Sequence, residues 1–356
     1  MKQRIVWIDV VKTLTMLLVI LGHCSYLTIS TAYGGVDYVS LIDGEQSKVS
    51  WLLGIVTRII YSFHMPLFMA MSGACLQLAS SKNQPFVSMI KNKWHRLIIP
   101  FIFTTLLVSV PVKYISGYWD SSTNIVKDIV LGQLLLMGNS HLWFVVALFW
   151  IFIEHRFLLK LKINLKSPIV LFLLLAISMA VTPLPEFLGL KASLRFLVYF
   201  TLGYSFVRDV DRINLGLGKS LLAMVLFFVG VFLGDKVIWH FQSQDVINTL
   251  TTLANVVFAI IGMILMVAIS KQLATKMQFV NNKVYKNLNR NSYDLYLYSD
   301  PFNYAILLIA FNNFGGAILT DNTIAFVLYF ARFILTIAFA YLIILCKQML
   351  MRQIQK

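Results

Sequence analysis

Residues 248–270 read NTLTTLANVVFAIIGMILMVAIS, an apolar stretch without a charged side chain. A helix needs about 20 mostly apolar residues to cross the hydrocarbon core of a bilayer. Similar apolar runs recur along the chain, at about 5–26, 51–79, 97–115, 141–159, 168–183, 193–207, 219–239, 248–270, 291–311 and 322–346. The pattern predicts an all-α integral membrane protein, with about ten transmembrane helices in one bundle and a single domain over residues 1–356.

The composition supports a chain whose surface faces lipid. Hydrophobic residues make up 59% of the 356 residues and charged residues only 13%, whereas a soluble domain carries about 25% charge. The net charge of +15 does not indicate nucleic-acid binding, because the basic residues lie in short segments between apolar runs rather than in one patch. The cysteines Cys24, Cys75 and Cys346 have no metal-ligand spacing. We therefore expect neither a metal nor a bound cofactor.

The basic residues also predict the topology. Most of them lie in alternate connecting segments, and such segments stay on the cytoplasmic side of a membrane. The predicted cytoplasmic segments carry Lys2 and Arg4, then Lys82 to Arg96, Arg156 to Lys166, Arg208 to Lys219, Lys271 to Arg290, and Lys347 to Lys356. Both termini are therefore expected in the cytoplasm, which favours a multi-pass protein of a bacterial cytoplasmic membrane.

The first apolar run contains three ionisable residues: Asp9, Lys12 and His23. Such charges argue against a cleaved signal peptide. An ionisable residue inside a span costs several kcal/mol unless it is paired or lines a wet cavity, so each is a functional candidate. Asp9 and Lys12 are neighbours on one helical face, and His23 lies on nearly the same face roughly 16 Å further along. The alternative interpretation is an interfacial histidine with a snorkelling lysine.

Two further segments carry candidate residues. His64 precedes Pro66 in the second run, where a loosened helix commonly lines a cavity; the alternative interpretation is that the histidine satisfies a stray carbonyl. Lys93 and Arg96 share a helical face at the cytoplasmic boundary and suit a polyanion such as a nucleotide phosphate. From spacing alone, membrane anchoring and lipid headgroup contact explain this pair better.

Later runs add polar residues at unusual depths. His141 and Trp143 begin the fourth run, where Trp143 fits an aromatic belt. Tyr296 and Asp300 lie in the ninth run, and Asp300 precedes a proline without an obvious local partner. Charge balance suggests that Arg332 pairs with it across the bundle.

Together these segments resemble the acyltransferase 3 family of integral membrane O-acyltransferases. The family carries a basic residue and, eleven positions later, a histidine in its first helix, which Lys12 and His23 match, with lysine in place of the more frequent arginine. Further matches are the segments FHMPLF at 63–68, KWHR at 93–96 and HLWF at 141–144. The late family block ends in histidine, whereas SYDLYLY at 292–298 is followed by Ser299.

The resemblance implies transfer of an acyl group, acetyl in many members, from cytoplasmic acyl-CoA to a hydroxyl of a cell-surface or lipid-linked glycan. Imidazole suits the removal of a hydroxyl proton, so His23 is the expected base. Lys12, balanced by Asp9, is expected to steady the donor or a developing oxyanion, and His64 to orient the acceptor or shape the cavity. Lys93 and Arg96 are the expected acyl-CoA contacts. His141, Trp143, Tyr296, Asp300 and Arg332 are candidates for the acceptor site or its cavity.

Two other classes remain open. A proton-coupled secondary transporter would also bury His, Asp and Lys in broken helices, although the chain shows no paired halves with matching interruptions. A non-catalytic lipid or glycan scaffold is favoured slightly by the absent late histidine.

Overall fold

The computed structural model describes residues 5–79, 84–210, 216–238 and 240–354, except for the side chains of Leu217 and Met277. Several basic residues used for the topology prediction, Lys2, Arg4, Lys82, Arg212 and Lys356, lie outside the described residues. The first half of the chain forms α1 Val6–His23, β1 Thr28–Thr31, β2 Gly34–Asp37, η1 Val39–Leu41, α2 Lys48–Leu78, α3 Phe86–Lys93, η3 Trp94–Ile98, α4 Ile99–Thr104, η4 Thr105–Ser109, α5 Val110–Ile115, α6 Ile125–Asp128, η5 Ile129–Leu134 and α7 Trp143–Lys160. The second half forms α8 Pro168–Ala180, α9 Leu190–Phe206, α10 Leu217–Ile238, α11 Gln244–Thr275, α12 Met277–Asn281, α13 Lys283–Ser299, α14 Pro301–Phe314, α15 Ala317–Thr320 and α16 Asn322–Ile354.

The structure confirms an all-α, multi-pass membrane protein. Within the described residues, 6 helices are long and apolar enough to cross a membrane: Val6–His23, Lys48–Leu78, Phe86–Ile115, Gly218–Ile238, Gln244–Thr275 and Asn322–Gln353. The other expected runs fold as α7, α8, α9 and the α13–α14 pair, which fall outside that set. The count of ten spans and the cytoplasmic position of the termini therefore stay predictions.

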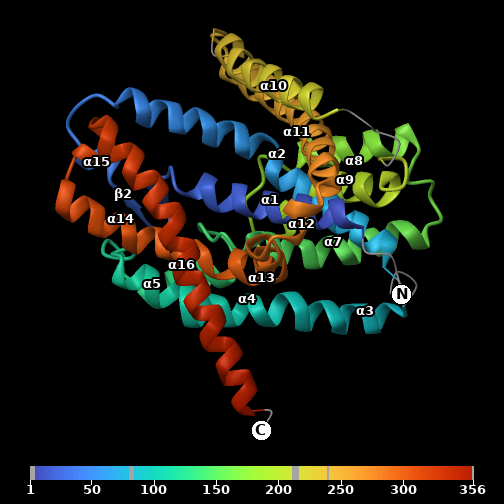
Figure 1. Cartoon of the computed structure of the whole chain (residues 1–356), viewed down its shortest axis with the longest axis horizontal. Helices are drawn as coiled ribbons and strands as arrows, with labels where there is room; N and C mark the ends of the chain where they lie inside the picture. The colour runs from blue at the N-terminus through green and yellow to red at the C-terminus, as the bar shows by residue number, and fades with distance from the viewer. Residues whose placement is uncertain (1–4, 80–83, 211–215, 239, 355–356) are drawn as a thin grey trace.

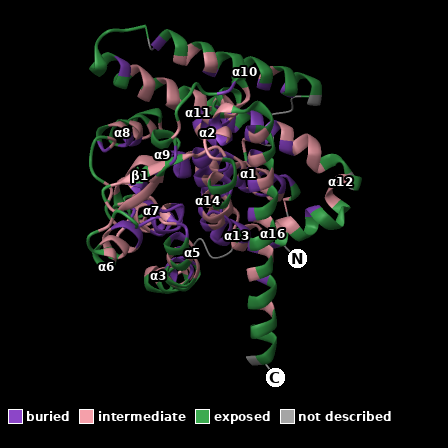
Figure 2. Cartoon of the chain, turned by 90° about the vertical axis from the view of Figure 1, so that its left-hand side faces the viewer, coloured by how far each residue is buried: buried purple, intermediate pink, exposed green. Residues whose placement is uncertain are grey.

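The buried core lies around α1 and α2, which cross the middle of the molecule in Figure 1, with α10 at one edge and α3 to α5 at the other. Figure 2 shows buried residues gathered on the central helices, whereas α10 and α16 are exposed along much of their length. The exposed side chains of these outer helices are largely apolar, among them Leu222, Leu226, Val327 and Ile334. Exposed apolar side chains along a whole helix fit a surface that faces lipid tails.

Glycines allow α2 and α9 to approach closely. A Cβ atom at Gly73 would lie 2.0 Å from the carbonyl oxygen of Phe200, and one at Gly203 would lie 1.8 Å from that of Ala70. Small residues at such positions let helix backbones pack closely in a membrane, where packing rather than the hydrophobic effect joins helices. This contact sets the position of the second helix, which carries His64, against α9.

We predict that Gly203→Ala lowers the stability of the fold. Alanine normally stabilises a helix by about 1 kcal/mol relative to glycine, but here the methyl group forces backbone displacement costing about 1–3 kcal/mol. Thermal unfolding of the purified protein in detergent should show a lower apparent Tm. Gly230→Ala in α10 is the matched control, since its Cβ would meet no atom within 4 Å. A Gly203→Ala protein as stable as this control would contradict the prediction.

The two long polar loops, 27–50 and 116–140, contact each other. Strands β1 and β2 form an antiparallel hairpin in the first loop, with Thr28 opposite Asp37. Trp119 of the second loop donates its indole N–H to the carbonyl of Tyr33 at 3.1 Å. The Thr28 hydroxyl, 2.6 Å from the Asp37 carboxylate, and the backbone N–H of Ser40 hold the pKa of Asp37 below its usual range. The two loops thus form ordered structure in contact with each other.

Candidate active site

His23 and Asp300 form the centre of the site. His23 is the last residue of α1, and Asp300 stands between α13 and α14. His23 Nδ1 is hydrogen-bonded to Asp300 Oδ1. An ionised carboxylate only accepts hydrogen bonds, so Nδ1 is assigned as the donor, and in the neutral form of the imidazole the lone pair then belongs to Nε2. This tautomer is the one that can take a proton from a substrate.

A proline brings a second histidine to the same carboxylate. Pro301 has no N–H, so the carbonyl of Leu297, four residues earlier, loses its helical partner. His141 Nε2 donates to this carbonyl at 3.0 Å. The bond turns the other ring nitrogen, Nδ1, toward Asp300 Oδ2 at 3.4 Å. Asp300 therefore lies between His23 and His141. The residue is buried, with only 8% of its surface exposed.

Ser299 occupies the position of the late family histidine. It is buried and lines a small pocket together with His23, His141, Tyr296 and Asp300. The contacts with both histidines come from the next residue, Asp300. The carboxylate thus supplies the polar group at this end of α13, where the family block would place an imidazole.

Arg332 does not pair with Asp300, so that prediction was wrong. Its guanidinium donates to the carbonyls of Tyr26 at 2.8 Å and His23 at 3.3 Å, and to Asn303 Oδ1 at 3.2 Å. The last carbonyls of a helix lack intrahelical partners and attract a cation. Arg332 therefore caps the C-terminal end of α1 and holds His23 in place through the backbone carbonyl of that histidine. Asp300 instead contacts the side chains of His23 and His141.

A cavity of about 460 Å³ opens beside these residues, and we call it the histidine cavity. It is lined by His23, His64, His141, Trp143 and Tyr296, together with Arg58, Glu186, Lys191, Arg195 and other residues. His64 Nδ1 lies 2.9 Å from the carbonyl of Ile60, so this side chain both lines the cavity and bonds a carbonyl of its own helix. The carbonyl whose helical partner Pro66 removes is that of Ser62, so the bond to Ile60 does not satisfy the freed carbonyl, whereas the position of His64 in the cavity lining agrees with the first interpretation.

A second cavity, of about 400 Å³, is lined by Lys12, Lys93 and Arg96, and we call it the lysine cavity. Lys12 Nζ is 3.3 Å from Asp9 Oδ1, as their spacing predicts. Lys93 Nζ lies 3.4 Å from the ring centroid of Phe152. Among the described residues that line this cavity, three side chains are cations and none is a carboxylate. The lining therefore favours an anionic ligand.

The π-helical turn η3 places Arg96 in this lining. Ile99 donates its N–H to the carbonyl of Trp94, which widens the helix by one residue per turn. Pro100 removes the helical partner of the Arg96 carbonyl, and the hydroxyl of Tyr293 in α13 donates to it at 2.9 Å. The proline thus both widens the turn and ties it to the helix that ends at Asp300.

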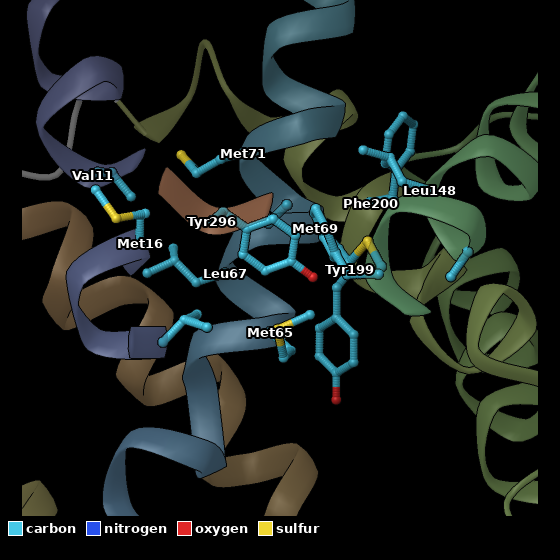
Figure 3. Close-up of a cluster of buried hydrophobic side chains, with 14 of the residues drawn as sticks. Val11, Met16, Met65, Leu67, Met69, Met71, Leu148, Tyr199, Phe200 and Tyr296 are labelled. Atoms are coloured by element: carbon cyan, nitrogen blue, oxygen red, sulfur yellow. The ribbon is translucent and has the colours of Figure 1, made fainter. Parts of the chain in front are cut away.

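Tyr296 lines both cavities and forms part of the wall between them. Its hydroxyl donates to the carbonyl of His141, and its ring packs 5.7 Å from that of Phe144. Figure 3 shows the tyrosine amid the buried side chains Met65, Leu67 and Met69 of α2. The same four helices, α1, α2, α7 and α13, contribute residues to each cavity.

Sequence reasoning missed three cations of the histidine cavity. Arg58, Lys191 and Arg195 were not among the candidate residues, yet all three line the cavity. The spacing of Lys191 and Arg195, four apart at the start of an apolar run, was the available signal, because residues at that spacing share a helical face.

Comparison with known proteins agrees with this arrangement. A family model described as an acyltransferase domain, that of the acyltransferase 3 family, matches residues 5–345. The chain belongs to the acyltransferase 3 family. It is also 27% identical over 213 residues to the nodulation protein NolL of Sinorhizobium fredii (strain NBRC 101917 / NGR234), a match that covers 59% of this chain. The chain spans about half the length (50%) of that relative. No solved structure matches.

Proposed function

We propose that this acyltransferase 3 family member moves an acyl group, with acetyl the first candidate, from cytoplasmic acyl-CoA to a hydroxyl of a cell-surface or lipid-linked glycan. The observation that carries the proposal is the pair of cavities on either side of Tyr296. One is lined by three cations, which suits the phosphates of coenzyme A. The other is lined by His23, whose Nδ1 is hydrogen-bonded to Asp300, which leaves Nε2 available as the base.

The reaction follows from these groups. The acceptor hydroxyl attacks the thioester carbonyl carbon, and His23 Nε2 takes the hydroxyl proton as the new C–O bond forms. The C–S bond then breaks, and the proton passes from His23 to the coenzyme A thiolate. Asp300 holds His23 in the reactive tautomer and stabilises the imidazolium. Tyr296 must let the acyl group pass between the cavities.

The remaining candidate residues assist His23 and Asp300 by binding the donor or shaping the cavity. Lys12, balanced by Asp9, steadies the donor or the developing oxyanion. Lys93 and Arg96 bind the donor phosphates from the cytoplasmic side. His64 and Trp143 shape the histidine cavity for the acceptor. The chain acts within a bacterial cytoplasmic membrane, in contact with its lipids, and needs no bound cofactor for this chemistry.

A proton-coupled transporter of a small polar solute is the second candidate, because two cavities separated by a thin wall also suit alternating access. Transfer of label from radiolabelled acetyl-CoA to a glycan fraction by the purified protein in detergent tests the first proposal. Solute uptake into proteoliposomes without acyl-CoA, together with no label transfer, would favour the transporter.

We predict that Lys93→Gln with Arg96→Gln weakens coenzyme A binding by about tenfold or more, since each hydrogen bond to a charged group contributes about 1.5–3 kcal/mol. Titration calorimetry with coenzyme A measures the effect. Lys91→Gln with Lys286→Gln is the matched control, because both lysines are exposed on nearby helices and neither lines the cavity. If the two double variants bound coenzyme A with equal affinity, Lys93 and Arg96 would instead be assigned to membrane anchoring.

A further inference from the structure

The cations of the histidine cavity differ in their pairing. Arg58 donates two hydrogen bonds to Asp235, at 2.9 Å and 3.0 Å, and a third to Asn255 at 2.9 Å. Its charge is therefore neutralised within the protein. Lys191 and Arg195 line the same cavity, and neither takes part in an ion pair with another residue that the structure describes. Two half-buried cations on one face of α9 thus face the cavity uncompensated.

Glu186, the one acid among the described residues of this lining, forms no ion pair with either cation. Glu186 accepts the backbone N–H of Phe187 at 3.0 Å through one carboxylate oxygen and that of Ala192 at 3.1 Å through the other. Both oxygens are thus used to hold the loop onto the start of α9. Uncompensated cations that share a lined cavity attract an anion from outside the protein.

Aromatic side chains connect the cation pair to the reactive histidine. The Arg195 guanidinium lies 5.7 Å from the ring centroid of Phe196. Phe196 stacks on Trp143 with the ring centroids 5.5 Å apart and an interplanar angle of 28°. Trp143 follows His141 by two residues, and His141 shares Asp300 with His23. Trp143 lines the same cavity as the cations and His23, so its ring can pack against a sugar that binds there.

We propose that Lys191 and Arg195 form an anion subsite and that the acceptor is an acidic glycan, which carries a carboxylate or a phosphate near the acylated hydroxyl. This assignment rests on the proposed function, and it adds the chemical class of the acceptor. The two cations hold the anionic group by charge-assisted hydrogen bonds, while the sugar ring packs on Trp143. The acceptor hydroxyl is thereby directed toward His23.

Titration calorimetry of the purified full chain in detergent tests the subsite with three probes: methyl β-glucuronide, glucose 1-phosphate and the neutral methyl glucoside. We expect at least one anionic probe to bind about tenfold more tightly than the neutral one. Lys191→Gln with Arg195→Gln should remove that preference, whereas Lys191→Arg should keep it. The glucuronide and the phosphate distinguish an acidic sugar from a phosphate-bearing acceptor.

One double variant serves as the control. Lys48→Gln with Lys236→Gln removes the same charge away from the cavity lining, and it should bind the anionic probe as the wild type does. The proposal is overturned if neither anionic probe binds, if the neutral probe binds as tightly, or if the Lys191/Arg195 variant keeps the preference. Failure of label transfer from acetyl-CoA would refute the proposed function without changing this binding result.

Discussion

Acyl transfer is expected to fall by about 10²- to 10⁴-fold when His23 is replaced by alanine, because that is the usual contribution of a positioned general base. In this chain the base nitrogen of His23 is left free by the bond between its Nδ1 and Asp300. Among the histidines that line the cavity, His23 is the one hydrogen-bonded to a carboxylate, since His64 bonds the Ile60 carbonyl and His141 bonds that of Leu297. The measurement is the rate of label transfer from acetyl-CoA.

A matched readout separates chemistry from folding. The lysine cavity contains no atom of His23, so coenzyme A binding by His23→Ala should equal that of the wild type. His23→Gln keeps a side chain that can bond Asp300 but offers no base, and it should be as inactive as the alanine variant. Wild-type transfer by either variant would show that another group takes the proton.

The second large effect is expected from Asp300→Asn, with transfer lowered on the order of 10²-fold or more. The amide of asparagine can donate a hydrogen bond to His23 Nδ1, which moves the ring proton to Nε2 and removes the base. The same change deprives His141 Nδ1 of its carboxylate neighbour at 3.4 Å. Steady-state kinetics should therefore show a lower kcat at unchanged coenzyme A affinity.

Asp294→Asn is the control for this substitution. Asp294 lies on the same helix, α13, and pairs with Lys347 at 2.8 Å on the exposed side. Its loss should leave the transfer rate close to that of the wild type. If Asp300→Asn behaved like this control, Asp300 would serve only to fill space between the two histidines.

Local patterns in the sequence were enough for the class of protein and for contacts within one helix. Apolar runs predict helices in lipid because the bilayer leaves no other way to satisfy the backbone. Helical periodicity places Lys12 next to Asp9, and the structure shows that pair. The same periodicity places Lys93 and Arg96 on one face, and both line one cavity, although the π-helical turn η3 that contains Arg96 was not predicted. The Asp9–Lys12 contact depends only on the pitch of a helix.

Contacts between helices needed the tertiary structure. Nothing local indicates that Asp300 lies against His23, which is 277 positions away, or that Arg332 closes the end of α1. The sequence prediction paired Arg332 with Asp300 from charge balance alone. That argument takes no account of the backbone carbonyls that lie near the guanidinium in the folded protein. Likewise, Gly73 and Gly203 reveal their role only once α2 and α9 are packed together.

Apolar runs and helical pitch therefore determined that this chain is a membrane protein and which residues share each helical face. Packing alone decided that two cavities meet at Tyr296 and that a carboxylate stands between two histidines. The physical reason is that helix formation depends on residues a few positions apart, whereas the contacts between helices in lipid depend on side-chain shape and on unsatisfied polar groups far apart in the chain.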